Sequence, residues 1–181
     1  MKELSLHILD IVQNSITAGA DLVRINIVED LTTDIFAIEV IDNGCGMDKE
    51  YAEKIKDPFI TGRESRKVGL GIPLLYAASK RCEGDLKIES GKGKGTIISV
   101  WLKHSHIDRA PLGNMVETLE ILIACNPDVD FLYNHSVNSK KFNFDTREIK
   151  KILGDVPVNH PEVLDWVKGH IQEGLSNLME V

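Results

Sequence analysis

Residues whose types and spacing suit nucleotide binding gather in the first half of the chain. Asp10 and Asn14 stand four residues apart, the segment Asp42-Asn43-Gly44-Cys45-Gly46-Met47 follows, and Gly69-Leu70-Gly71 comes after it. They offer an amide on a helix, a carboxylate on a tight glycine turn and a glycine-lined loop. An ATP site requires all three of these features. Their occurrence together and in this order is not expected by chance.

The first pair has the chemistry of a metal site. On a helix, His7, Asp10, Asn14 and Thr17 lie within an arc of about 80°. A carboxylate and an amide one turn apart can hold Mg²⁺ beside the phosphates of a nucleotide, or position a water. Asp10 is the only carboxylate on this stripe and is therefore the candidate catalytic base. Taken alone, the stripe is also typical of a solvated helix face.

The Asp42 segment suits recognition of a purine base. An ionised carboxylate accepts a hydrogen bond from an exocyclic amine, which adenine has and guanine lacks at the same position. Gly44 and Gly46 permit backbone angles that a β-carbon forbids, and Gly46 lets the backbone approach the base. Met47 supplies an apolar wall. An ordinary Asp-Asn-Gly turn is the alternative interpretation of these residues.

The second glycine segment suits a phosphate. Gly69, Leu70 and Gly71 precede a predicted helix, whose first N–H groups and positive dipole end attract an anion. Arg63 and Lys67, in the short segment before it, are candidates to contact the γ-phosphate. Glycines before a helix are common, so this segment alone is weak evidence.

Hydrophobic periodicity predicts the elements that position these residues. We expect Asp48 to cap a short helix whose first turn includes Tyr51. The main predicted elements are a helix over 3–19, strands over 21–29 and 34–41, a helix over 71–82, and strands over 85–89 and 96–103. Beyond Pro111 we expect a helix over 114–125, a hairpin over 131–144, and helices from Asp145 and Pro161.

Composition excludes several classes of protein. The formal charge is −7, which argues against non-specific nucleic-acid binding. No run of about 18 apolar residues and no basic-then-apolar leader is present, so we expect neither a membrane span nor a signal peptide. The three cysteines are scattered without a CxxC pair, which favours reduced thiols and a cytoplasmic protein. His104-Ser105-His106 lacks further ligands at metal spacing, so a solvated strand end is the better interpretation.

Over residues 3–103 the chain resembles the GHKL ATP-binding superfamily of gyrase, heat-shock chaperones, MutL and histidine kinases. Asp10 to Asn14 is similar to its N box, and the segments at Asp42 and Gly69 to its two glycine boxes. The residues Pro58-Phe59-Ile60-Thr61 and Gly93-Lys94-Gly95-Thr96 are similar to motifs of histidine kinases. The resemblance implies that Asn14 holds Mg²⁺, Asp42 binds the adenine amine with support from Thr96, and Gly69 and Gly71 form the phosphate loop.

The resemblance predicts an α/β fold: a two-layer sandwich with a mixed sheet covered on one face by helices. We expect a GHKL-type ATP-binding domain over 1–104 and a separate α+β appendage, helical with one hairpin, over 105–181. The first functional hypothesis is a histidine-kinase-like protein that uses Mg·ATP on a protein partner carrying the phosphoacceptor. The second is a non-kinase ATPase or a nucleotide-dependent switch. A degenerate fold that binds protein without nucleotide is disfavoured, because the adenine and magnesium positions are intact.

Overall fold

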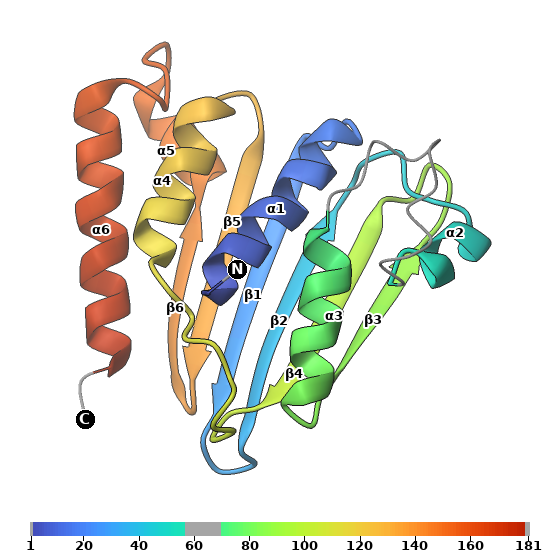
Figure 1. The fold of residues 1–181 in the computed structure, drawn as a ribbon. Helices are drawn as coiled ribbons and strands as arrows, with labels where there is room; N and C mark the ends of the chain where they lie inside the picture. The colour runs from blue at the N-terminus through green and yellow to red at the C-terminus, as the bar shows by residue number, and fades with distance from the viewer. Residues whose placement is uncertain (1, 57–69, 180–181) are drawn as a thin grey trace.

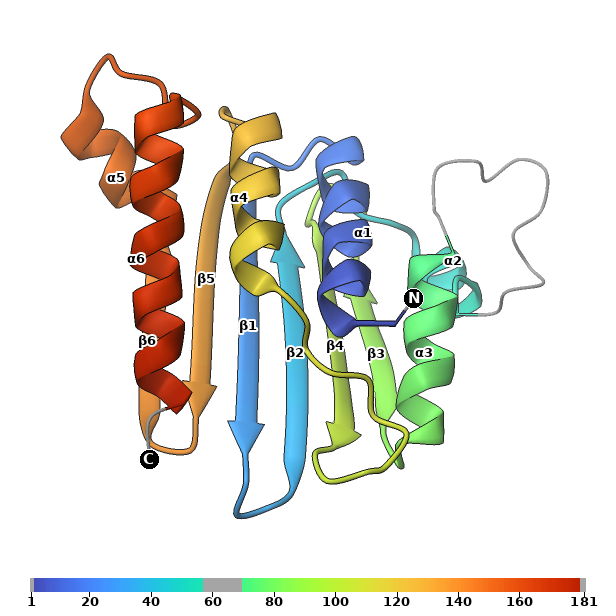
Figure 2. The same cartoon turned by 60° about the vertical axis from the view of Figure 1, so that its left-hand side comes forward.

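A computed structural model of the chain describes residues 2–56 and 70–179. One six-stranded mixed sheet, in the order β3-β4-β2-β1-β5-β6, carries helices on one face (Figures 1 and 2). The elements are α1 (Leu4–Thr17), β1 (Leu22–Asp30), β2 (Ile35–Asp42), α2 (Lys49–Lys54), α3 (Gly71–Arg81), β3 (Asp85–Ser90), β4 (Thr96–Lys103), α4 (Met115–Cys125), β5 (Asp130–Val137), β6 (Lys140–Asp145), α5 (Thr146–Leu153) and α6 (Pro161–Met179). The expected two-layer α/β fold is confirmed.

Helix α1 lies on the sheet because its apolar residues recur at helical spacing. Leu4, Ile8, Ile11 and Val12 are at most 1% exposed and form one stripe. Burying each such side chain contributes about 1.5–3 kcal/mol to folding. The C-terminal end of α1 lies beside the loop that follows β2, where the Cys45 N–H donates to the Ala18 carbonyl at 2.9 Å.

Strand pairing brings the ends of β2 and β4 together. The two strands are antiparallel, and Asp42, the last residue of β2, is the register partner of Thr96, the first residue of β4. Thr96 is in turn the register partner of Ser90, the last residue of β3. Three polar residues from three adjacent strands therefore form one row at this end of the sheet.

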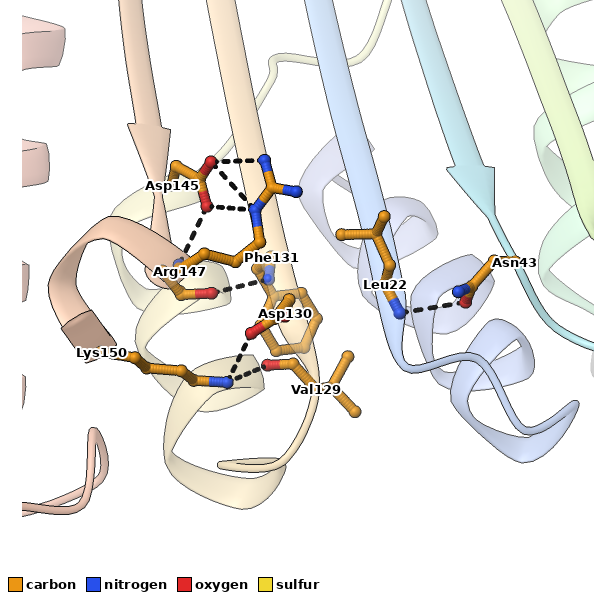
Figure 3. Close-up of polar contacts among 9 residues, drawn as sticks. Leu22, Asn43, Val129, Asp130, Phe131, Asp145, Arg147 and Lys150 are labelled. Atoms are coloured by element: carbon orange, nitrogen blue, oxygen red, sulfur yellow. Dashed lines mark hydrogen bonds and ion pairs between the residues drawn. The ribbon is translucent and has the colours of Figure 1, made fainter. Parts of the chain in front are cut away.

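The C-terminal hairpin belongs to the same sheet, which differs from the separate appendage that we expected. Strand β5 pairs in parallel with β1 over eight register positions, from Leu22 with Asp130 to Glu29 with Val137. The Lys150 ammonium of α5 contacts the Val129 carbonyl at 3.1 Å and the Asp130 carboxylate at 2.7 Å, which holds the start of β5 (Figure 3). The proposed boundary between residues 104 and 105 remains a prediction.

Local signals in the sequence correspond closely to the observed elements. Asp48 caps α2, where its carboxylate accepts a hydrogen bond from the Tyr51 N–H, as expected. The predicted strand over 96–103 has the bounds of β4, and Pro73 lies in the first turn of α3. Within residues 2–56 and 70–179, no helix combines the length and apolarity required to cross a membrane.

Candidate functional site

A cavity of about 420 Å³ lies beside the C-terminal half of α1, the loop after β2, and α2. Of the residues that the sequence singled out, it is lined by Asn14, Asp42, Gly46, Met47 and Thr96. The described part of the chain has two larger hollows, of about 620 and 680 Å³, and none of the predicted site residues lines either of them. These five residues, which were predicted to bind a nucleotide, therefore all line the 420 Å³ cavity.

Asp42 lies in this cavity with its carboxylate held from two sides. The Ser15 hydroxyl donates to Oδ2 at 2.6 Å, and the Gly44 N–H donates to Oδ1 at 3.0 Å. Asp42 is only 9% exposed, so these bonds compensate for part of the cost of burying a carboxylate. The geometry leaves Asp42 as a fixed hydrogen-bond acceptor at the end of β2.

The Asp42 loop and the turn between β3 and β4 interlock through glycines. Gly46 and Gly95 have φ angles of +66° and +78°, which side chains rarely tolerate. A β-carbon on Gly46 would lie 2.0 Å from the carbonyl oxygen of Gly91, and one on Gly95 would lie 2.0 Å from that of Asp42. Both glycines are therefore required by close backbone approach, in addition to any contact with a ligand.

Asn43, the neighbour of Asp42, has a structural role. Its Oδ1 accepts hydrogen bonds from the N–H groups of Asp21 and Leu22, each at 3.0 Å, and its Nδ2 donates to the Asp21 carboxylate at 2.6 Å. Figure 3 shows the bond between Leu22 and Asn43. Asn43 thus ties the end of β2 to the start of β1 and orients the loop that carries Asp42.

Two serines complete the surroundings of the cavity, and neither of them was predicted from the sequence. Ser15 holds Asp42, as described above. The Ser90 hydroxyl contacts the Met47 N–H at 2.8 Å, the Gly95 carbonyl at 2.9 Å and the Thr96 hydroxyl at 2.9 Å. The available signals were that Ser15 follows Asn14 directly and that Ser90 ends a strand before the glycine turn.

The two predicted metal-site residues on α1 have different surroundings. Asn14 lines the cavity, and among the described residues its buried Nδ2 has no hydrogen-bond partner. Asp10 does not line this cavity but faces the start of α3, where a β-carbon on Gly71 would lie 1.9 Å from its Oδ2. An orphaned buried amide nitrogen suits a ligand that supplies an acceptor, such as a phosphate oxygen.

His7 is a further group at the junction of α1 and α3. It is 3% exposed, and burial lowers its pKa, although a hydrogen bond with the Gly71 backbone and the nearby Asp10 carboxylate oppose that shift. Its Nδ1 has no partner among the described residues. His7 is therefore a buried imidazole beside Asp10, not part of a solvated stripe.

Several predicted residues lie outside the described part of the chain. These are Arg63, Lys67 and Gly69, together with the segment Pro58-Phe59-Ile60-Thr61. Of the second glycine segment, Leu70 is 57% exposed and Gly71 is the first residue of α3. The phosphate-loop role of these residues stays a prediction.

His104 belongs to a buried network at the end of the sheet that is opposite to the cavity, where β1 and β4 end. Glu29 accepts hydrogen bonds from His104 Nε2 at 2.8 Å and His135 Nε2 at 2.9 Å, and His135 Nδ1 lies 2.9 Å from the Tyr133 hydroxyl. Instead of ending a strand in solvent, His104 helps to satisfy a carboxylate that is only 9% exposed. Sequence could not reveal this, since Glu29 and His135 are 106 residues apart.

Comparison with known families matches residues 2–106 to the histidine kinase-, DNA gyrase B-, and HSP90-like ATPase family. The chain belongs to this family, as the motifs predicted. It is 34% identical over 100 residues to sporulation kinase C of Bacillus subtilis, an alignment that covers 55% of this chain and 23% of that protein. It is 31% identical over 99 residues to a putative sensor protein of Shewanella frigidimarina, covering 54% and 15% of the two chains.

A solved structure shares the fold. The N-terminal domain of a DNA repair protein superposes with a TM-score of 0.55 at 18% identity, over 86% of this chain and 58% of that one. The chain spans less than a quarter of the length of these two relatives, the sporulation kinase and the putative sensor protein. Similarity therefore establishes the ATPase family and its fold.

Proposed function

We propose that this protein binds Mg·ATP in the 420 Å³ cavity and acts on a protein partner in the manner of a histidine kinase. The observation that carries the proposal is Asp42, a buried carboxylate held by Ser15 and Gly44 as an acceptor inside the cavity. The 6-amino group of adenine offers the hydrogen-bond donor that such a carboxylate requires. Membership of an ATPase family independently supports a nucleotide as the ligand.

The other cavity residues fit the rest of the nucleotide. Met47 and Ile98 provide apolar surface for the faces of the base, and Thr96 lies beside Asp42 in the register. Asn14, with its unpartnered Nδ2, faces the same space and is the candidate to bind the phosphates and their Mg²⁺. Oxygen ligands from one amide and from phosphates suit a hard cation that keeps several waters.

We place the phosphoacceptor on another protein. None of the histidines in the described part of the chain lines the cavity, so none of them is positioned to accept a phosphoryl group there. The kinase relatives support phosphoryl transfer as the chemistry, and they are much longer proteins than this chain.

A nucleotide-dependent switch with slow hydrolysis is the second candidate. It is favoured by the position of Asp10, which packs against Gly71 and does not line the cavity. A base must approach within about 2.6–3.2 Å of the proton that it takes, directly or through a water. In such a switch, hydrolysis is slow until a partner completes the site. The binding of ATP, and not its hydrolysis, then changes the affinity of this protein for the partner.

Incubation of the purified chain with γ-labelled ATP and a cell lysate separates these functions. Label that appears on a lysate protein with the wild type, and not with Asp42→Asn, supports the kinase. ATP binding without any transferred label, together with ATP-dependent retention of a lysate protein, supports the switch. Calorimetry that detects no binding of ATP to the folded wild type contradicts both.

A further inference from the structure

We infer that Ser90 is a specificity-determining residue, which orients the Thr96 hydroxyl so that Asp42 and Thr96 present only hydrogen-bond acceptors to the base. Such a pair selects purines that carry an amino group at position 6 and rejects purines that carry a carbonyl there. The inference rests on the proposed function and extends it to Ser90, which does not itself line the cavity.

The hydroxyl of Ser90 has three polar neighbours at hydrogen-bond distance. It lies 2.8 Å from the Met47 backbone nitrogen, 2.9 Å from the Gly95 carbonyl oxygen and 2.9 Å from Thr96 Oγ1. Ser90 is half-buried, and Thr96 is 8% exposed. These contacts join the last residue of β3 to the first residue of β4 and to the Asp42 loop.

Counting protons fixes the direction of each bond. A serine hydroxyl has one proton and two lone pairs, and a carbonyl oxygen can only accept. The Ser90 proton therefore goes to Gly95, and the Met47 N–H occupies one of the two lone pairs of Ser90 Oγ. The remaining lone pair is available only to a donor, so Thr96 donates its proton to Ser90.

With its proton committed to Ser90, Thr96 has only lone pairs left for the cavity. The neighbouring Asp42 already accepts from Ser15 and Gly44, and its remaining lone pairs also accept. Because Asp42 and Thr96 are register partners on β2 and β4, the two acceptors stand side by side. A 6-amino group supplies two protons to this pair, whereas a 6-carbonyl group brings further lone pairs against it.

Loss of the Ser90 hydroxyl releases this restriction. In Ser90→Ala the Thr96 proton has lost its acceptor, so it can rotate towards the cavity and donate to a carbonyl. We expect the preference for ATP over inosine triphosphate, which has a carbonyl at position 6, to fall about tenfold. That change corresponds to one neutral hydrogen bond. ATP affinity itself should fall less than this preference, because Asp42 is unchanged.

The test is calorimetric titration of the full chain with ATP and with inosine triphosphate, each with Mg²⁺, with thermal unfolding to verify that every variant is folded. Ser90→Thr retains the hydroxyl and should retain the preference. Ser99→Ala is the matched control, because Ser99 lies on β4 and, among the described residues, its hydroxyl bonds only to Glu39, at 3.4 Å. Thr96→Val, which removes the restricted acceptor itself, should reduce the preference as Ser90→Ala does, while Asp42 retains part of it.

Each outcome decides the inference. Reduced preference in Ser90→Ala and Thr96→Val, with wild-type preference in Ser90→Thr and Ser99→Ala, supports it. An unchanged preference in folded Ser90→Ala overturns it, and if that variant does not fold, an unchanged preference in Thr96→Val does so. If the wild type binds neither nucleotide, the proposed function fails first. Tight ATP binding with no preference in the wild type overturns the inference and the adenine-binding role of Asp42, while the binding of Mg·ATP itself stands.

Discussion

The Ser15 hydroxyl donates a hydrogen bond of 2.6 Å to the carboxylate of Asp42, joining α1 to the end of β2. The same hydroxyl lies 3.2 Å from the carbonyl oxygen of Ile11, one turn earlier on the helix. Both of these neighbours are acceptors, so the single proton of the Ser15 hydroxyl is directed towards them. Because Asn14 precedes Ser15 directly, one helical turn fixes the candidate phosphate ligand and the candidate adenine acceptor relative to each other.

Ser15→Ala should weaken ATP binding about tenfold without abolishing it. The variant removes one bond to a charged group, while the Gly44 N–H continues to hold Asp42. Calorimetry measures the affinity, and thermal unfolding should show a moderate loss of stability. Ser15→Thr keeps the hydroxyl and should recover most of the affinity. Wild-type affinity in a folded Ser15→Ala variant would show that Asp42 does not depend on Ser15.

Asp42→Asn should reduce ATP affinity about ten- to hundredfold, because one acceptor oxygen becomes a donor that faces the adenine amine. The wild type should bind ATP and ADP far better than GTP, and the variant should lose this discrimination. Calorimetry with the three nucleotides checks both statements. Equal ATP affinity in the wild type and the variant would exclude Asp42 as the adenine-binding residue.

Asn14→Ala should abolish the dependence of tight ATP binding on Mg²⁺ and should affect ADP less. Mg²⁺ requires oxygen ligands at about 2.0–2.1 Å and tolerates poor geometry badly, so loss of an amide ligand is not easily compensated. Titrations of ATP with and without Mg²⁺ test this. Gln13, the exposed neighbour on α1, provides the control Gln13→Ala. An unaltered magnesium effect in Asn14→Ala would place the metal elsewhere.

Hydrolysis of ATP by the isolated protein should be slow, and Asp10→Asn should reduce it further. Asp10 is shorter than glutamate by one methylene and packs beside Gly71, so it is poorly placed to activate a water. Steady-state phosphate release measures turnover, with ATP affinity determined in parallel. Rapid hydrolysis by the pure protein, or activity that survives Asp10→Asn unchanged, would contradict the assignment of Asp10 as the base.

The buried Glu29 should make folding stability depend on acidic pH. Burial alone would raise its pKa, but hydrogen bonds from His135 and His104 outweigh burial and lower it below the ordinary value of 4.5. A carboxyl whose pKa is lower in the folded state stabilises the fold above its unfolded-state pKa. This stabilisation is lost as the pH falls through the folded-state pKa.

Urea unfolding of the wild type and Glu29→Gln from pH 7 to pH 3 tests this dependence. The variant should be less stable by about 1–3 kcal/mol at pH 7, and the difference should shrink towards pH 3. Glu53→Gln, an exposed change on α2, should show no such convergence. A constant difference across the range would mean that Glu29 contributes through packing and not through its charge.

Local elements and motifs could be predicted from the sequence because they depend on neighbours in the chain. The stripe of Leu4, Ile8 and Ile11 determined that α1 is a helix with one buried side, and alternation determined β2 and β4. Gly46 marked a positive φ angle, which few other residues adopt, whereas Gly44, for which we expected the same, does not have one. The same local signals were sufficient to indicate the ATPase family.

Only the tertiary structure decided which distant residues meet. Alternation assigns the faces of β5 but not its neighbour, so the parallel pairing with β1 could not be anticipated. No local feature of the sequence distinguishes Ser15 and Ser90 from other serines. In the structure, Ser15 lies 2.6 Å from the Asp42 carboxylate, and Ser90 lies 2.9 Å from the Thr96 hydroxyl. A hydrogen bond depends on distance and direction in space, and for residues far apart in the chain these are set by packing of the whole sheet and its helices.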